Sequence, residues 1–193
     1  MSAPERPRLF VGVELPESVR TAIHDATASW RGSLPAFRWT RPDALHLTIV
    51  FIGNVDAEHV HAIEAAVEAA AAALAPVPTG LTRLGMFPER GGARVLWVGL
   101  DDPDGGLVRV ASAVAAPLDA FLESDERPYH PHITIARTRR PAAVPAAFPD
   151  GQVPAARWTI DALTLFRSHL GAGGPRYERL GRWSLQAGRP EVP

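Results

Sequence analysis

Two short His-x-Thr motifs stand out in the sequence, HLT from His46 and HIT from His132, each inside a run of apolar and β-branched residues. Residues i and i+2 of a strand point to the same face, so the histidine of each motif should project beside its threonine, Thr48 or Thr134. Two imidazoles can divide acid and base work because the pKa of histidine lies near neutrality. Two hydroxyls can donate hydrogen bonds to the non-bridging oxygens of a phosphate. A cleft lined by both motifs would therefore suit the hydrolysis of a phosphate ester.

The motifs allow two other interpretations. Both histidines could be structural residues inside a core, although burying a polar side chain costs free energy unless it finds a partner. His130, His132 and His46 could also hold a metal ion, because His130 and His132 would share a strand face. Neither motif contains an Asp or Glu that could complete or orient such a site. We therefore expect no metal and no other cofactor.

The elements around the motifs repeat along the chain. RLFVGVELP from Arg8 and ARVLWVGLDDP from Ala93 are each typical of an apolar strand closed by a proline, and each is followed by a helical pattern and then by a motif strand. The prolines, Pro16 and Pro103, are 87 residues apart, and the motif histidines are 86 apart. This order predicts a duplicated strand–helix–strand architecture with a pseudo-two-fold axis, whose repeats start near residues 8 and 94.

The remaining patterns complete an α+β protein in one domain, residues 1–193, with two intimate lobes. A strong helical pattern covers residues 56–76, and further strand patterns begin at Leu81, Ala156 and Arg176. We expect two antiparallel sheets around a central cleft, with the helices outside.

The composition limits the partners. Lys and Arg number 20 against 21 Asp and Glu, which gives a net charge of −1. Proteins that hold long nucleic acids usually carry a basic excess, so an RNA ligand would be contacted locally, at an end or over a few nucleotides. Cysteine is absent, which excludes disulfides and thiolate metal sites. No apolar run approaches the ~20 residues of a membrane span, and the N-terminus lacks a signal region. We expect a cytoplasmic monomer with no membrane partner and a flexible tail at 187–193.

The sequence resembles the RNA 2′,3′-cyclic phosphodiesterases, also called 2′-5′ RNA ligase-like proteins, of the two-histidine (2H) phosphoesterase superfamily. The resemblance covers nearly the whole chain and rests on RLFVGVELP, RWTRPDALHLTIVFIG, RVLWVGL, RPYHPHITIAR and LTLFRSHLGAGGPRYERL. It implies a bilobal α+β fold with a central cleft. It also implies an RNA 2′,3′-cyclic 3′-phosphodiesterase, a phosphoric diester hydrolase that converts RNA or nucleotide 2′,3′-cyclic phosphate ends to 2′-phosphates without a metal or nucleotide cofactor.

By position, the resemblance makes the two motif histidines catalytic and the two motif threonines phosphate-binding. It implies that His46 is the acid at the 3′ oxygen and His132 the base that activates water. In similar proteins the residue five after each motif histidine flanks the nucleobase, which here means Phe51 and Arg137. An aromatic face and a guanidinium plane can both stack on a base. The alternatives are core packing for Phe51 and a solvated charge for Arg137.

Residues 139–154, RRPAAVPAAFPDGQVP, are expected to form a loop. Its first two residues, Arg139 and Arg140, either extend a basic rim beside the second motif or are solvated.

Three functions are compatible with these patterns. The first is hydrolysis of cyclic phosphate ends, with RNA 3′ ends or small nucleotides as the ligands. The second is a non-catalytic protein on the same scaffold that binds RNA ends or nucleotides, from which we would expect one motif residue to be lost. The third is the same chemistry on another small nucleotide, such as a cyclic phosphate of ADP-ribose or a 2′,5′-linked oligonucleotide. All four motif residues are present, which favours an enzyme.

Overall fold

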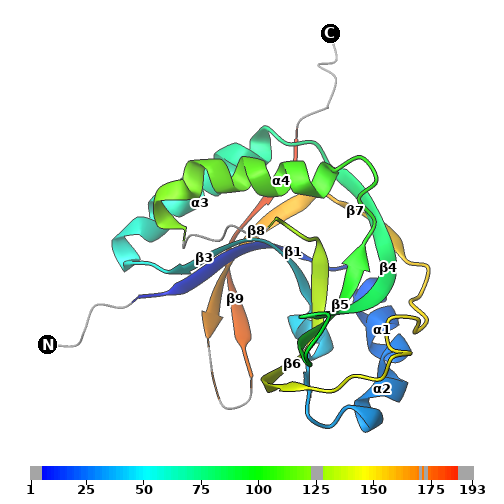
Figure 1. Ribbon diagram of the computed structural model, residues 1–193. Coiled ribbons are helices and arrows are strands. Elements are labelled where there is room, and N and C mark those ends of the chain that lie inside the picture. Colours follow the sequence, from blue (N-terminus) through cyan, green and yellow to red (C-terminus); the bar gives the residue numbers. More distant parts are fainter. Residues whose placement is uncertain (1–5, 123–127, 170, 172–173, 187–193) are drawn as a thin grey trace, which may run out of the picture.

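The computed structural model describes residues 6–122, 128–169, 171 and 174–186. Within these residues, nine strands form one curled antiparallel sheet that carries helices on its outside (Figure 1). The order of the strands is β7-β4-β5-β6-β3-β1-β8-β9, and the short β2 pairs with β6 beside this path. The strands are β1 (Arg8–Glu14), β2 (Arg38–Trp39), β3 (His46–Asn54), β4 (Val77–Phe87), β5 (Ala93–Leu100), β6 (His132–Ala142), β7 (Arg157–Ile160), β8 (Ala162–His169) and β9 (Arg176–Ser184). The tail expected to be flexible, residues 187–193, lies outside the described residues.

The helices fall into two groups. The first pair precedes the first motif, and the second pair lies side by side across the outer face of the sheet (Figure 1). The α-helices are α1 (Glu17–Ala26), α2 (Ala28–Ser33), α3 (Val60–Ala72) and α4 (Gly106–Ala115), and short 3₁₀ turns cover Pro42–Ala44, Ala57–His59 and Ala116–Phe121. No helix of the described residues is long and apolar enough to cross a membrane.

The expected order of strand, helix and motif strand is found twice, with β1 before α1 and β3, and with β5 before α4 and β6. The expectation of two separate sheets is wrong. The strand order divides into two halves of four strands, β6-β5-β4-β7 and β3-β1-β8-β9. The two motif strands join the halves, because Leu47 of β3 pairs with Ile133 of β6 in antiparallel order. In addition, β4 precedes the second repeat but pairs with β5, and β8 follows that repeat but pairs with β1. A single curled sheet therefore includes strands of both repeats.

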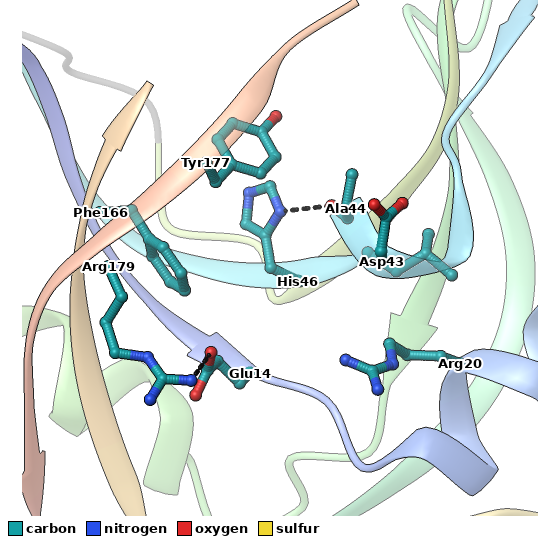
Figure 2. Close-up of a pocket in the computed structure, with 9 residues that line it drawn as sticks. Glu14, Arg20, Asp43, Ala44, His46, Phe166, Tyr177 and Arg179 are labelled. Carbon is teal, nitrogen blue, oxygen red and sulfur yellow. Dashed lines mark hydrogen bonds and ion pairs between the residues drawn. The ribbon is translucent and has the colours of Figure 1, made fainter. Parts of the chain in front are cut away.

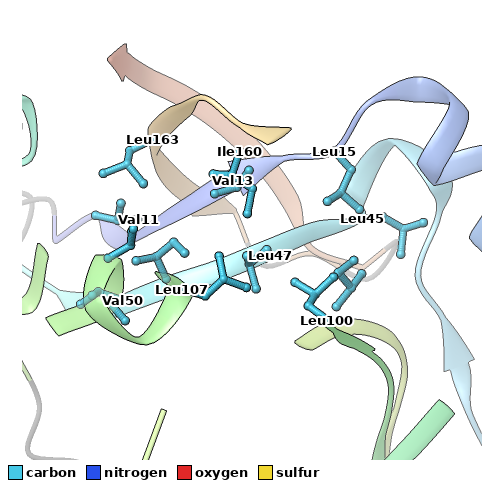
Figure 3. Packing of buried hydrophobic residues seen from close by; sticks show 14 of the residues in the cluster. Val11, Val13, Leu15, Leu45, Leu47, Val50, Leu100, Leu107, Ile160 and Leu163 are labelled. Carbon is cyan, nitrogen blue, oxygen red and sulfur yellow. The ribbon is translucent and has the colours of Figure 1, made fainter. Parts of the chain in front are cut away.

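The core explains which face of the motif strands carries the chemistry. Leu47 and Ile133, the middle residues of the two motifs, are fully buried. Figure 3 shows Leu47 and Val11 of the sheet packed beside Leu107 of α4, whose apolar stripe is buried along its length. Because neighbouring side chains of a strand alternate between faces, the histidine and threonine of each motif project from the face opposite α4.

Two local expectations differ from the structure. The first helical pattern is broken at Thr27, whose hydroxyl donates a hydrogen bond to the Ile23 carbonyl at 2.8 Å, so α1 ends and α2 begins there. The expected loop from residue 139 starts later, because β6 continues to Ala142, which pairs with Ala93 of β5. Arg139 and Arg140 therefore lie on a strand rather than in a loop.

Candidate active site

Both motif histidines are held by the same backbone contact. The Nδ1 atom of His46 lies 2.9 Å from the carbonyl oxygen of Ala44, and that of His132 lies 2.8 Å from the carbonyl oxygen of His130. A carbonyl oxygen can only accept a hydrogen bond, so Nδ1 must carry the proton in both rings. In a neutral ring this leaves the lone pair on Nε2, where it can accept a proton.

The register of the two strands brings the motifs together. Since Leu47 faces Ile133 in antiparallel order, the residue before one lies beside the residue after the other. His46 therefore lies beside Thr134, and Thr48 lies beside His132. The four side chains that the sequence predicted to converge share one face, and each histidine is neighbour to the threonine of the other motif.

Close packing of the neighbouring strand supports this arrangement. Gly12 of β1 pairs with Thr48, and a Cβ atom on Gly12 would lie only 2.7 Å from the carbonyl oxygen of Leu47. Any side chain at this position would force β1 away from the first motif. The glycine thus allows the backbone of β1 to lie directly beside the motif strand.

A β-bulge lies directly after each motif. On β3, Thr48 pairs with Gly12 and Val50 with Val11, so Ile49 is an extra residue. On β6, Ile135 is extra in the same way, between the pairs that Thr134 and Ala136 form with β5. Each extra residue shifts the alternation of side chains by one position. Both strands show the same burial sequence, in which two consecutive residues are buried after the threonine.

The bulges explain how residues at an odd offset from the histidines reach the site face. Without a bulge, a residue five positions after a histidine would point to the opposite face. With it, Phe51 and Arg137 return to the face of the motif side chains. Phe51 is 39% exposed, and the Arg8 guanidinium lies 4.5 Å from the centre of its ring, so the alternative of core packing does not apply. The Arg137 guanidinium donates a hydrogen bond to the Thr134 hydroxyl at 3.1 Å, so it is more than a solvated charge.

The structure does not bring Phe51 and Arg137 to one place. Both follow their motif along the chain, but the two motif strands run in opposite directions. Arg137 thus lies at the His46 end of the motif pair, and Phe51 at the His132 end. A single base contacted by both would have to reach across the motif pair.

The environment lowers the pKa of both histidines. The pKa of His46 is lowered from 6.5 to about 4, chiefly by desolvation; the hydrogen bond to Ala44 opposes the shift, and the nearby charges of Arg137 and His132 add to it. The pKa of His132 is also lowered, first by desolvation and then by His130 and Arg137. Without a bound anion, both rings therefore favour the neutral form at neutral pH, and His46 does so more strongly.

The walls around the two histidines are aromatic. The rings of Phe10 and Tyr177 lie 4.8 and 4.7 Å from that of His46, measured between ring centres. On the other side, the ring of Phe87 lies 5.2 Å from that of His132, and Trp97 lies behind it. No sequence motif pointed to Tyr177. It lies on β9, far from both motifs in the chain, and only the β8–β9 hairpin brings it to His46.

Two pockets meet at His46, Ala44 and Tyr177. The smaller one, of about 330 Å³, is the Glu14 pocket shown in Figure 2; its remaining lining residues are Glu14, Arg20, Asp43, Leu45, Phe166 and Arg179. The larger one, of about 870 Å³, is called here the arginine pocket, and its remaining lining residues are Ala36, Arg38, Trp39, Thr40, Arg41, Thr134, Arg137, Thr138, Arg139, Arg140, Pro141, Ala142 and Pro175. The site therefore has room for more than the reacting phosphate.

The donor set gives no geometric support to the metal interpretation. In the described part of the chain, no three His, Asp or Glu side chains are grouped closely enough to hold a metal ion. The rings of His130 and His132 are stacked with their centres 6.2 Å apart.

Comparison with known proteins places this geometry in context. Residues 15–172 match the family model described as the 2′-5′ RNA ligase superfamily. A protein of Thermus thermophilus named RNA 2′,3′-cyclic phosphodiesterase is 33% identical over 190 residues, which cover 93% of this chain and 90% of the relative.

Solved structures show the same fold. A crystal structure from Thermus thermophilus superposes with a TM-score of 0.79 at 30% identity, covering 93% of this chain and 98% of the other. The structure of Escherichia coli LigT complexed with 3′-AMP gives a TM-score of 0.75 at 27% identity, covering 94% and 99%. The second of these holds a nucleotide.

Proposed function

Because the chain belongs to the 2′-5′ RNA ligase superfamily, we propose that it hydrolyses the 2′,3′-cyclic phosphate ends of RNA or nucleotides to 2′-phosphates. The observation that carries this proposal is the pairing of the two motifs, which sets two imidazoles and two hydroxyls on one face of the sheet. Both rings keep Nε2 available because a backbone carbonyl occupies Nδ1. Two imidazoles with an available Nε2 atom are the groups that acid–base hydrolysis of a phosphodiester requires.

The proposed reaction is a single in-line displacement at phosphorus. One neutral imidazole takes a proton from water through Nε2 while the water oxygen bonds to phosphorus. The bond between phosphorus and the 3′ oxygen breaks, and the second imidazole, protonated, gives its proton to that oxygen. The products are a 3′ hydroxyl and a 2′-phosphate. The water and the 3′ oxygen lie at opposite ends of the reaction axis, which assigns one histidine to each end.

The threonine hydroxyls are proposed to bind the non-bridging phosphate oxygens. The Arg137 guanidinium can only donate, so the Thr134 oxygen accepts from it and keeps its own hydrogen free for the phosphate. Charge on the non-bridging oxygens grows in the transition state, where a fixed donor contributes most.

The division of roles between the histidines rests on resemblance alone, which makes His46 the acid and His132 the base. The pKa order without ligand favours the opposite, because the ring with the lower pKa is the one more fully neutral. A bound phosphate anion raises the pKa of the ring that it contacts. We retain the assignment from resemblance as a proposal to be tested with substrates of different leaving groups.

Phe51 and Arg137 are proposed as contacts of the nucleotide. The ring of Phe51 is exposed, and Arg137 lines the arginine pocket. Since they lie at opposite ends of the motif pair, we propose that only one of them stacks on the terminal base and that the other contacts a different part of the ligand.

One assay tests the function directly. The purified protein is incubated with a nucleoside 2′,3′-cyclic phosphate in EDTA, and the product isomer is identified. We expect turnover and a 2′-phosphate. Loss of turnover in EDTA that Zn²⁺ or Mn²⁺ restores would replace the proposed mechanism with a metal-dependent one. A 3′-phosphate would contradict the proposed geometry, and binding without turnover would favour a non-catalytic binder.

A further inference from the structure

The arginine pocket concentrates positive charge in a chain whose net charge is −1. Five arginines line it, and none of the described lining residues carries a carboxylate. By contrast, the Glu14 pocket, on the other side of His46, balances two arginines with two acids. The charge of the site is therefore unequal on its two sides.

Ion pairs neutralise some arginines of this chain but not all of those in the arginine pocket. Outside the pocket, Arg157 faces Asp101 at 3.1 Å and Arg179 faces Glu14 at 2.7 Å. In the pocket, Arg41 pairs with Asp43 at 3.1 Å. Arg139 and Arg140 have no ion-pair partner among the described residues. Arginines that no carboxylate neutralises, such as these two, are typical of a phosphate-binding surface.

The placement of these charges along one strand gives the surface a direction. Arg137, Arg139 and Arg140 follow Thr134 on β6, so the charges lead away from the proposed phosphate-binding hydroxyl. The strand is irregular over this stretch, because Ile135 is a bulge and a second register shift against β5 lies between Arg137 and Ala142. Trp39 of the paired strand β2 lines the same pocket and adds an aromatic surface beside the arginines. Arginines interleaved with an aromatic ring are suited to single-stranded nucleic acid.

We propose that the arginine pocket binds the RNA chain on the 5′ side of the cyclic phosphate, through its phosphodiester groups. Arg139 and Arg140 are then specificity residues that favour an oligonucleotide over a mononucleotide. This inference rests on the proposed function, because it takes the cyclic end to lie at the two motifs.

The alternative path for the chain is the Glu14 pocket. Both of its acids are ion-paired, Glu14 with Arg179 and Asp43 with Arg41. Arg20 lines this pocket and has no partner among the described residues. A single cation could hold one phosphate but not a chain, which is why the arginine pocket is the better candidate.

The test compares two substrates and four proteins. The substrates are a nucleoside 2′,3′-cyclic phosphate and a five-nucleotide RNA with the same cyclic end. The proteins are the wild type, the double variant R139Q/R140Q, R20Q, and the control R109Q, which changes an exposed arginine on α4. Thermal unfolding confirms that each variant is folded.

We expect the wild type to prefer the oligonucleotide. The double variant should lose about tenfold in kcat/KM on the oligonucleotide, mainly through KM, and less than twofold on the mononucleotide. The slope of log kcat/KM against log salt for the oligonucleotide should fall by roughly 0.7 for each phosphate group that the variant no longer binds. R109Q should match the wild type. Equal losses on both substrates, a wild type without preference, or a preference lost in R20Q but kept in the double variant would each overturn the proposal.

A binding measurement separates this inference from the proposed reaction. A fluorescent five-nucleotide RNA with a 2′-phosphate end, the proposed product, is titrated with the wild type and the double variant. If the wild type turns over neither substrate, the proposed function fails, yet weaker binding by the double variant still supports the RNA-binding pocket. Equal affinities in the two proteins would refute the pocket even where turnover is present.

Discussion

The two motif strands share a backbone but differ in surroundings. In both, the histidine ring donates to the carbonyl of the residue two positions earlier, the middle residue is buried, and a bulge follows the threonine. The residues five after the histidines differ, because Phe51 is an exposed ring and Arg137 is a cation bonded to the motif threonine. The reacting groups of the two motifs are therefore alike, while the residues around them differ.

The difference extends to the walls and to the charge. Tyr177 contacts the ring of His46, whereas His130 lies beside His132 and contributes to lowering its pKa. The arginine pocket opens at the His46 end and has His46 and Thr134 in its lining. A symmetric pair of motifs can bind a phosphate, which is nearly symmetric itself, but a nucleotide is not symmetric. We infer that the paired motifs serve the phosphate and that the unequal flanks distinguish the two ends of the substrate.

The largest effect is expected where the two halves are most alike. His46→Ala and His132→Ala should each reduce turnover of a nucleoside 2′,3′-cyclic phosphate by roughly a hundredfold or more, because each removes a general acid or base. The double variant should be little worse than the poorer single variant, since the two rings act as a unit. Steady-state rates of the three variants test this.

A matched control is His61→Ala, which removes an exposed histidine from α3, and it should keep wild-type turnover. If one motif variant stays within a few-fold of the wild type, the reaction does not use both halves, and that histidine has no role in catalysis.

Features that depend on neighbouring residues could be predicted from the sequence, whereas features that depend on contacts between distant residues could not. The motif strands and the buried stripe of α4 follow from local alternation and helical spacing, and the structure confirms them. The number of sheets could not be predicted, because it depends on the contact of Leu47 with Ile133, which are far apart in the chain. Two strands can be recognised without any indication that they pair with each other.

The site shows the same limit. Strand periodicity alone places a residue five after each histidine on the wrong face, and only the resemblance pointed to Phe51 and Arg137. The consecutive apolar pairs after the threonines, beginning at Ile49 and Ile135, are the sequence trace of the bulges, but such pairs are equally typical of a fully buried strand. Tyr177 had no local signal, because a hairpin from the end of the chain brings it to His46.

A smaller effect should separate the two threonines. Thr48→Val and Thr134→Val keep the side-chain shape and remove one donor, so each should lower kcat by about ten- to a hundredfold. We expect Thr134→Val to be the more damaging, because it also removes the acceptor of Arg137. Separate measurement of kcat and KM tests this, with Thr159→Val on the edge strand β7 as the control. Losses confined to KM would mean that the hydroxyls bind substrate and transition state equally.

A substrate with a better leaving group tests which half supplies the acid. Such a leaving group needs less protonation. It should therefore raise the rate of the variant that lacks the acid by roughly tenfold or more, and the rate of the variant that lacks the base only slightly. Under the assignment from resemblance, His46→Ala is rescued and His132→Ala is not. The opposite pattern would agree with the pKa order of the two rings and would reverse the assignment.

The smallest effect concerns stability. Desolvation lowers the pKa of His46 to about 4 in the folded chain, against about 6.5 when unfolded, so between these values the unfolded chain binds a proton that the folded chain does not. Stability should therefore decrease as the pH falls through this window. The pKa of His132 shifts in the same direction but less, so His46→Gln should remove more of the pH dependence than His132→Gln.

One pKa unit corresponds to about 1.4 kcal/mol. Each kcal/mol shifts Tm by about 2–4 °C at this chain length. Between pH 7 and pH 4.5, the wild-type Tm should fall at least ~2 °C further than that of His46→Gln. Parallel curves for the two proteins would show that the His46 ring is solvated in the folded chain, and the difference in pKa between the two histidines would then be lost.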